Sequence, residues 1–213
     1  MTNTNDSTIN DSTGQQVIDD LFAALTGDDI EQLLHTRLVD EAERDGVLDV
    51  SYRTIDSPIG PLLLAATPDG LVRVAFDCEG HDVVLAQLAS DISPRILRAP
   101  RLLDGAAAQL DEYFNGRRRA FDVAIDFQLA HGFRRTVLTH LRDVAYGETA
   151  SYAMLAAASG SPNAVRAVGS ACANNPLPLV VPCHRVVRSD GSIGRYRGGT
   201  AAKQALLAME AVT

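Results

Sequence analysis

One stretch restricts the fold of this chain more than any other: "NNPLPLVVPCHRVVRSDG", residues 174–191. Its apolar side chains can bury themselves in a core, and its prolines limit how the backbone on either side can bend. The run therefore delivers its end, Cys183, to a fixed place, with His184 and Arg185 directly after it. The apolar positions are Leu177, Leu179, Val180 and Val181, and the prolines are Pro176, Pro178 and Pro182.

A cysteine at such a place is either a nucleophile or a small core residue. Only the thiolate attacks, and an imidazole or a cationic neighbour is its usual activator, so His184 and Arg185 favour chemistry at Cys183. Against this, a buried cysteine is more often a core hydrophobe. Adjacent residues of a strand also point to opposite sides, so a contact between Cys183 and His184 requires a turn or a bridging water. The pair alone leaves both alternatives open.

Length and composition set broad limits. A chain of 213 residues holds one large domain or two small ones, with a core that needs no disulfide or metal. No stretch reaches the length of an apolar membrane span, and the polar N-terminus differs from a signal peptide, so we expect a cytoplasmic protein without a membrane partner. Three cysteines without a CxxC pair indicate reduced thiols. Cys78 and His81 are too few ligands for zinc, and no metal site is expected.

Charge is distributed unevenly along the chain. The formal net charge is −8, yet residues 1–49 carry twelve acidic and two basic side chains. Residues 131–200 carry eight arginines against three acidic residues, a local balance of +5. A basic segment inside an acidic protein indicates a nucleic-acid contact that the total charge conceals.

The N-terminal residues predict an extension of the main fold. Residues 1–14 are almost free of bulky apolar side chains and are expected to be a disordered tail. Residues 15–48 place apolar side chains at helical spacing on both sides of Gly27, which predicts a short acidic helical hairpin. The plain interpretation is that this hairpin packs on the main body and keeps its acidic face in solvent. The alternative is an acidic arm that covers the basic segment and competes with nucleic acid.

Residues 49–128 are expected to form a small α/β domain. Two or three hairpin-linked strands are predicted after Val50, where Ser-Pro, Gly-Pro and Pro-Asp-Gly turn signals separate β-rich runs. Helices are predicted near residues 82–92 and 101–115. Alternation in "GRRRAFDVAIDF" predicts one more strand near residues 120–127.

Residues 129–213 form the second expected domain. An amphipathic helix is predicted in "FRRTVLTHLRDV", followed by two short helices. The first closes at Gly160, and Ser161-Pro162 is expected to open the second as a hydroxyl N-cap followed by a proline at the first helical position. This arrangement is a candidate helix-turn-helix. On the second helix, Val165, Val168 and Cys172 are expected to share one face, and Asn163, Arg166 and Ser170 the opposite one.

The complete string around Cys183 narrows these alternatives. "PCHRVV", preceded by "NNPLPLVV" and followed by "SDGSIGRYRGG", resembles the O6-alkylguanine-DNA alkyltransferases, and the likeness runs from about Tyr52 to Glu210. It implies an α/β (α+β) fold: a small ribonuclease-H-like N-terminal domain with a short antiparallel sheet, and a mainly helical C-terminal domain with a winged-helix-like helix-turn-helix.

The resemblance also implies an activity. Members move an alkyl group, mainly methyl, irreversibly from O6-alkylguanine in double-stranded DNA to their own cysteine, once per molecule, after flipping the nucleotide. O4-alkylthymine is a further expected substrate. No cofactor is implied, and the free protein is expected to be a monomer.

Residue by residue, the resemblance makes Cys183 the alkyl acceptor, His184 a base that acts through a water, and Glu210 the carboxylate that orients the histidine. Asn175 would brace the hinge before the acceptor, and Tyr152 would help to rotate the nucleotide and protonate the leaving guanine. Arg166 would fill the gap left by the flipped base, with Ala164, Val165, Ser151, Ser170, Arg134 and Arg135 as further DNA contacts. The wall of the substrate pocket would comprise Pro178, Val186, Tyr196, Arg197 and Gly198.

One departure and three alternatives accompany this interpretation. Arg197 stands where the family often has a small residue, so we expect slower repair of large adducts than of methyl. The first alternative is a damage-flagging protein that binds alkylated DNA without transferring the alkyl group. Such proteins lack the acceptor cysteine, which this chain has. A thiol hydrolase built on Cys183, His184 and Glu210 leaves Arg166 without a role, and a transcription factor leaves the cysteine unexplained.

Overall fold

The computed structural model describes residues 26–211 and divides the chain into two units, residues 1–45 and 46–213. The described part of the first unit is helix α2, Gly27–Arg44. It begins with a capping box, because Asp29 N donates to Thr26 Oγ1 and Asp29 accepts from Thr26 N in return. This confirms the second helix of the expected extension. The tail at residues 1–14 and the first helix, expected before Gly27, lie outside the described residues.

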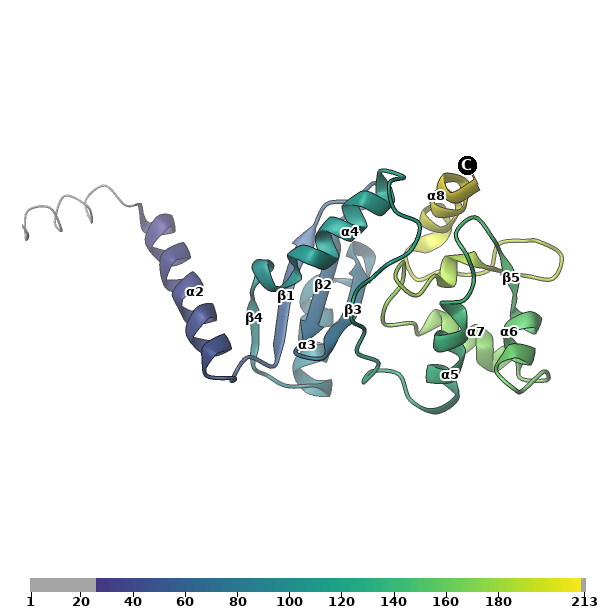
Figure 1. Cartoon of the computed structure of the whole chain (residues 1–213), viewed down its shortest axis with the longest axis horizontal. Helices are drawn as coiled ribbons and strands as arrows, with labels where there is room; N and C mark the ends of the chain where they lie inside the picture. Colours follow the sequence, from purple (N-terminus) through teal and green to yellow (C-terminus); the bar gives the residue numbers. More distant parts are fainter. Residues whose placement is uncertain (1–25, 212–213) are drawn as a thin grey trace, which may run out of the picture. The chain divides into compact units, whose positions relative to one another are not determined.

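The second unit begins with a four-stranded sheet (Figure 1). Its strands are β1 (Val50–Ile55), β2 (Leu62–Thr67), β3 (Gly70–Phe76) and β4 (Ile96–Arg98). The order is β3-β2-β1-β4, and the three hairpin-linked strands are antiparallel as expected. Strand β4 pairs parallel with β1, so the sheet is mixed and the expectation of an antiparallel sheet was wrong at this edge.

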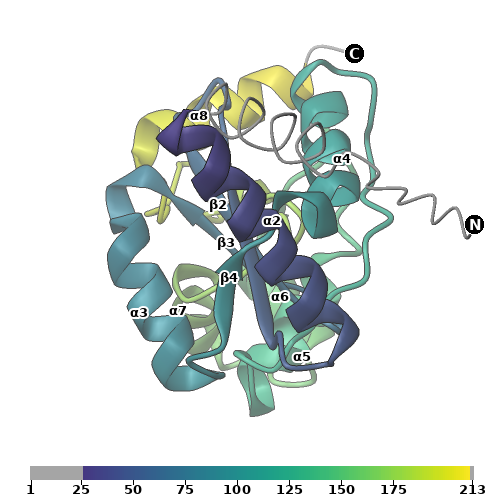
Figure 2. The ribbon, with the colours of Figure 1, turned by 90° about the vertical axis from the view of Figure 1, so that its left-hand side faces the viewer.

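Both faces of the sheet are covered. Helix α3 (His81–Asp91) packs Val84 and Leu88 on one face, and helix α4 (Asp104–Phe114) packs Leu110 and Tyr113 on the other. Figure 2 shows the two helices on opposite sides of the strands. Short 3-10 turns, Asp77–Glu79 and Pro100–Leu103, precede them. Burial on two sides explains why β2 reads as a continuous apolar run instead of an alternating one.

The strand expected near residues 120–127 is absent from the described structure, where this segment makes one isolated bridge, Leu71 to Ile125. Leu71 N donates to Ala124 O at 2.8 Å, and Asp126 N donates to Leu71 O at 2.9 Å. Further along β3, Val74 N donates instead to Pro176 O at 2.8 Å. Residues 124–126 and Pro176 therefore share the edge of β3. Residues 120–127 can pair with only part of that edge, so they form an isolated bridge instead of a strand.

The remaining elements are mainly helical (Figure 1). They are α5 (Gly132–Leu141), β5 (Ala150–Ser151), α6 (Tyr152–Ala158), α7 (Val165–Ala173), a 3-10 turn (Cys183–Arg185), β6 (Val186–Val187) and α8 (Gly199–Ala211). Strands β5 and β6 pair in parallel. Helices α6 and α7 are the two expected short helices.

The start of the second short helix differs from the expectation. Helix α7 begins at Val165 after Ala164, whose side chain caps nothing. Ala164 N donates to Ser161 O at 2.8 Å, so Ser161 and Pro162 form a separate turn ahead of the helix. The hydroxyl cap belongs instead to α6, where Ser151 Oγ accepts from Met154 N at 3.1 Å.

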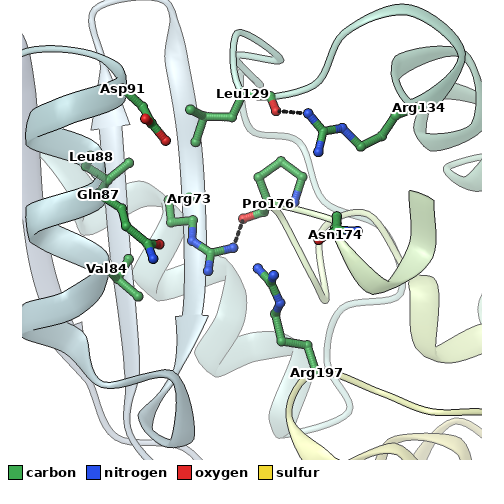
Figure 3. A pocket seen from close by; sticks show the side chains of 10 residues that line it. All are labelled: Arg73, Val84, Gln87, Leu88, Asp91, Leu129, Arg134, Asn174, Pro176 and Arg197. Carbon is green, nitrogen blue, oxygen red and sulfur yellow. Dashed lines mark hydrogen bonds between the residues drawn. The ribbon is translucent and has the colours of Figure 1, made fainter. Parts of the chain in front are cut away.

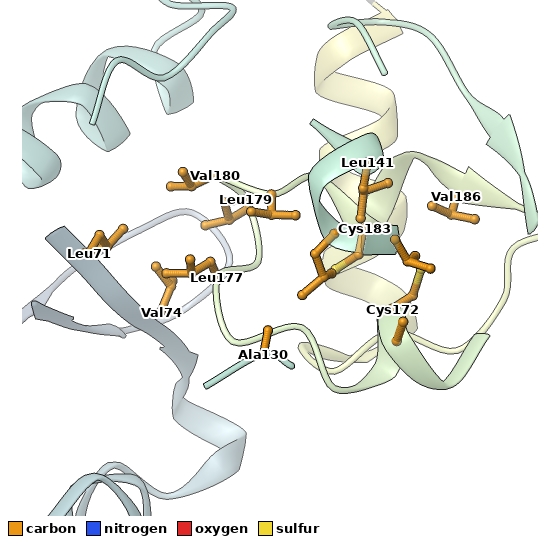
Figure 4. Packing of buried hydrophobic residues seen from close by; sticks show 14 of the residues in the cluster. Leu71, Val74, Ala130, Leu141, Cys172, Leu177, Leu179, Val180, Cys183 and Val186 are labelled. Atoms are coloured by element: carbon orange, nitrogen blue, oxygen red, sulfur yellow. The ribbon is translucent and has the colours of Figure 1, made fainter. Parts of the chain in front are cut away.

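A single hydrophobic core joins the sheet to these helices. Its buried members include Val74 of β3, Leu110 of α4, Leu138 of α5 and Val181, which lies shortly before Cys183. Figure 4 shows Leu71 and Val74 on one side and Leu141 and Cys183 on the other, with Leu177 and Leu179 between them. Across residues 26–211, none of the helices has the length and apolar character of a membrane span.

Candidate active site

The backbone before Cys183 is held by a buried asparagine. Asn175 Nδ2 donates to Val181 O at 2.7 Å, and Asn175 Oδ1 accepts from Leu177 N at 3.0 Å. Within this loop Leu179 takes a positive φ of 74°, a conformation that costs energy for a residue with a side chain. All four apolar positions of the run are buried, as the sequence predicts. The amide of Asn175 therefore fixes both ends of the segment that carries the thiol.

Cys183 lies in the 3-10 turn and is 4% exposed. Figure 4 places it among the apolar side chains of the core, near Leu141 and Cys172. Burial raises the pKa of the Cys183 thiol, although Asn175 and the charge of Lys203 act in the opposite direction. A raised pKa favours the neutral thiol over the thiolate, and a neutral thiol needs a base to become a nucleophile.

His184 supplies a base that is already oriented. Its Nε2 lies 3.0 Å from Glu210 Oε1, and an ionised carboxylate only accepts, so Nε2 carries the proton. Nδ1 is then an acceptor. It is buried and has no hydrogen-bond partner among residues 26–211. Burial lowers the pKa of His184 against the pull of Glu210, which keeps the ring neutral and able to accept a proton.

Glu210 is the most heavily bonded carboxylate of the site. Arg185 Nε donates to Oε2 and Arg185 Nη2 to Oε1, both at 2.8 Å, and the Tyr113 hydroxyl donates to Oε1 at 2.6 Å. Burial alone would raise the pKa of Glu210, but the hydrogen bonds from His184, Arg185 and Tyr113 hold it well below its ordinary range. The carboxylate is therefore charged whenever the fold is intact.

Two neighbours of the site could not be read from the sequence, and a third, Arg185, was recognised only as a cationic neighbour of Cys183, without its contact to Glu210. Tyr113 lies 97 positions from Glu210 and carries no local signal. Lys203 is completely buried and donates from Nζ to Val186 O at 2.5 Å, which places its charge close to the thiol. A lysine in the amphipathic pattern of α8 reads as a surface residue, so only the fold reveals it.

The expected pocket wall is assembled from several loops. Tyr196 packs edge-on against Phe76 of β3, with ring centroids 5.4 Å apart. A Cβ on Gly198 would lie 2.7 Å from the Phe76 ring, and a Cβ on Gly194 would lie 2.5 Å from the Tyr152 hydroxyl. Because neither glycine has a Cβ, the Phe76 and Tyr152 rings can pack closely against the backbone of this loop. The other wall positions, Pro178 and Val186, are buried.

The Arg197 side chain extends toward the sheet, where Arg73 of β3 also lies. Its Nη1 lies 3.2 Å from Glu79 Oε2, and Arg73 pairs with the same carboxylate. Figure 3 shows Arg73 and Arg197 on one cavity of about 200 Å³, where Arg134 donates to Leu129 O at 2.8 Å. Cys183 is not among the residues that line it. The expectation of slow repair of large adducts stays a prediction.

Helix α7 presents the candidate DNA-binding face. Arg166, Asn163 and Ser170 are exposed as predicted, while Val168, Ala171 and Cys172 are buried. Val165 begins the helix and is 39% exposed, so of the three residues expected to share one face it is the one that is not buried. Ala164 is half-buried, and Arg135 of α5 is exposed with its guanidinium 6.0 Å from the Phe127 ring.

Comparison with known proteins gives consistent results. Residues 50–127 match the ribonuclease-like domain of 6-O-methylguanine DNA methyltransferase, and residues 132–212 match the DNA-binding domain of that family. The methylated-DNA–protein-cysteine methyltransferase of Mycolicibacterium paratuberculosis is 38% identical over 161 residues, which cover 76% of this chain and 92% of that protein. The Homo sapiens protein of the same name is 36% identical and covers 76% and 81%.

Solved structures agree with the sequence matches. The Mycobacterium tuberculosis O6-methylguanine methyltransferase has a TM-score of 0.66 at 38% identity, covering 76% of this chain and 93% of that one. The same protein crystallised with DNA has a TM-score of 0.63, covering 76% and 92%.

Proposed function

Because the chain belongs to the methylated-DNA–protein-cysteine methyltransferase family of DNA repair enzymes, we propose that Cys183 is the residue to which it transfers the alkyl group. The observation that carries this assignment is the pairing of a buried thiol with a neutral, oriented imidazole on the next residue. The 3-10 turn at Cys183–Arg185 replaces the strand geometry that would send the two side chains to opposite sides.

The proposed reaction is a direct displacement. The thiol proton of Cys183 passes through a water to His184 Nδ1, and Glu210 holds the ring by its Nε2 proton. The sulfur then forms a bond to the alkyl carbon, while the bond between that carbon and guanine O6 breaks and its electron pair stays with the guanine. Tyr152 returns a proton to the base. The product thioether is stable to water, so each molecule acts once.

Access to the alkyl group requires nucleotide flipping, because Cys183 is buried in the protein and cannot reach a base that stays stacked in the duplex. We propose that α7 lies in the minor groove, where Arg166 fills the space left by the extruded base. Exposure of Arg166 on the helix supports this placement. The proposed substrate is double-stranded DNA that contains O6-alkylguanine or O4-alkylthymine, and the proposed working state is a cytoplasmic monomer.

A damage-flagging protein that binds without transfer is the second candidate. Nothing in the site favours it, since the acceptor cysteine is present beside His184 and Glu210. A thiol hydrolase would leave the exposed Arg166 unexplained.

Intact-protein mass spectrometry tests the assignment. The protein is mixed with excess duplex DNA that contains one O6-methylguanine, with Cys183→Ala as the test variant and Cys172→Ala as a matched control from the same core. We expect a gain of one methyl group, mapped to Cys183, in the wild type and in Cys172→Ala. Retained binding without any gain of mass in the wild type would support the flagging candidate instead.

A further inference from the structure

A residue of the sheet domain contacts the proposed proton relay. Tyr113 belongs to α4, yet its hydroxyl lies 2.6 Å from Glu210 Oε1 and 3.4 Å from His184 Nε2. Its side chain is completely buried. Burial and the nearby charge of Glu210 raise the pKa of Tyr113, so the hydroxyl keeps its proton and acts as a donor. The carboxylate that orients His184 is therefore bonded from both domains at once.

Packing prevents the Tyr113 ring from leaving this position. Phe121 lies at a centroid distance of 5.3 Å, and Tyr146 lies at 6.1 Å with its plane almost perpendicular. Phe114 contacts the ring edge-on at 5.4 Å. Aromatic neighbours on several sides fix the ring plane and hence the direction of the hydroxyl. A flexible side chain could move together with Glu210. The Tyr113 ring is held in place, so its hydroxyl determines where the Glu210 oxygen lies.

We propose that Tyr113 is a positioning residue of the transfer reaction: its hydroxyl fixes the Glu210 oxygen that holds His184 in the orientation needed to take the Cys183 proton. This inference rests on the proposed transfer to Cys183. It makes the sheet domain a contributor to the chemistry, whereas the sequence indicates only a supporting role for it.

Loss of the Tyr113 hydroxyl should leave the fold intact but change the hydrogen bonding of Glu210 and His184. In Tyr113→Phe the carboxylate still accepts from Arg185 and His184, so Glu210 is not left unpaired. Without the Tyr113 hydroxyl, Glu210 accepts the hydrogen bond from His184 Nε2 more strongly. This stronger hydrogen bond favours the protonated form of the His184 ring. His184 takes the thiol proton only when neutral, so the variant needs a higher pH to reach its full rate.

The titration of His184 depends on every charged or titratable group around it. Glu210 favours the protonated ring, whereas burial and the charges of Arg185 and Lys203 oppose it. The groups that face or adjoin the ring are Glu210 and Lys203 of α8, Tyr113 of α4, Cys183 and Arg185 of the 3-10 turn, and Tyr196 of the following loop.

Single-turnover transfer of methyl from an O6-methylguanine duplex, measured from pH 5.5 to 9 with saturating protein, tests the proposal. For Tyr113→Phe we expect a rate at neutral pH lower by about tenfold, as for loss of a hydrogen bond to a charged group. The acid limb of the profile should move to higher pH, while affinity for undamaged duplex is unchanged. Tyr52→Phe, which removes a hydroxyl from β1 on the α3 side of the sheet, should keep the wild-type profile.

A double-mutant cycle separates action through Glu210 from a general effect on packing. If Tyr113 acts through the carboxylate, the Tyr113→Phe change should have little further effect in the Glu210→Gln background. Equal pH profiles for Tyr113→Phe and wild type, or additive losses in the cycle, would overturn the inference while leaving transfer to Cys183 intact. Absence of methyl on Cys183 in the wild type would instead overturn the proposed function.

Discussion

Arg185 binds both oxygens of Glu210 through two different guanidinium nitrogens, each at 2.8 Å. Its third nitrogen, Nη1, donates to Val144 O at 2.6 Å, so the side chain ties together the 3-10 turn, α8 and the loop that follows α5. Such a two-point contact fixes the rotation of the carboxylate as well as its place. The position of His184 thus depends on the residue that follows it.

Arg185→Lys tests this contact. A lysine keeps the charge but offers one point of contact, so the carboxylate gains freedom and Val144 O loses its donor. We expect the free energy of unfolding to fall by about 2–3 kcal/mol and the transfer rate to fall at least tenfold. Arg118→Lys, in the more exposed pair with Glu112, should cost at most about 1 kcal/mol. Equal losses for the two variants in urea unfolding would contradict the prediction.

The three cysteines should differ in reactivity toward iodoacetamide. Cys78 is exposed, whereas burial raises the pKa of Cys172 to about 12 and also raises that of Cys183. Only thiolate reacts, and a raised pKa means that deprotonation needs a higher pH. Peptide mapping after labelling at pH 7.5 should therefore show Cys78 modified first. Labelling of Cys183 as fast as Cys78 would mean that the free protein already holds a thiolate.

Arg166→Ala should separate DNA handling from chemistry. The exposed guanidinium on α7 is proposed to replace the flipped base, and the transfer step itself does not need it. We expect transfer from duplex DNA to slow about tenfold, a loss typical of a desolvated cation–aromatic stack. Transfer from the free base O6-methylguanine should be unchanged. Arg101→Ala, in the sheet domain, is the charge-matched control, and a slower reaction with the free base would place Arg166 in the chemistry.

Gly194→Ala probes the close approach to Tyr152. The added Cβ would lie 2.5 Å from the Tyr152 hydroxyl, so the phenol has to shift. We expect a loss of about 1–3 kcal/mol in the free energy of unfolding and slower transfer, because Tyr152 no longer faces the base as before. Gly105→Ala in α4 meets nothing within 4 Å and should be neutral or stabilising. Thermal melts and single-turnover rates of both variants decide the matter.

Deletion of residues 1–45 tests the acidic-arm hypothesis. Residues 1–49 carry twelve acidic and two basic side chains, and the cut falls at the limit between the two units. If this charge competes with DNA, the shortened protein should bind duplex DNA more tightly at low salt, and the gain should shrink as salt rises. Unchanged affinity across a salt titration would leave the extension as a solvated appendage.

Local patterns predicted most of the regular elements. Turn signals indicated the hairpins of β1 to β3, and local patterns indicated α3 to α7, because these elements bury one face or a continuous run against the apolar clusters on the two faces of the sheet. Strand β4 was missed because three residues carry no periodicity. The strand expected at residues 120–127 did not form because its partner edge on β3 also receives Pro176, and Arg73 of β3 and Pro176 are 103 positions apart in the sequence.

The candidate site also contains residues that the sequence could predict and residues that it could not. Cys183, His184 and Glu210 follow from the family resemblance, and the fold brings the last two together. Tyr113 and Lys203 could not be foreseen, since a buried tyrosine in α4 and a lysine in α8 look like any core aromatic and any surface base. Tyr113 reaches Glu210 from the other domain, whereas Lys203 reaches Val186 O within its own, and both contacts arise from packing rather than from spacing.

The way the β3 edge is covered bears on how this protein avoids self-association. Unpaired backbone groups on an outer strand can template the addition of another chain. Here residues 124–126 and Pro176 occupy those groups on β3, and the opposite outer strand, β4, is three residues long between Pro94 and Pro100. Neither border offers a length of free backbone on which a neighbouring molecule could build a ladder.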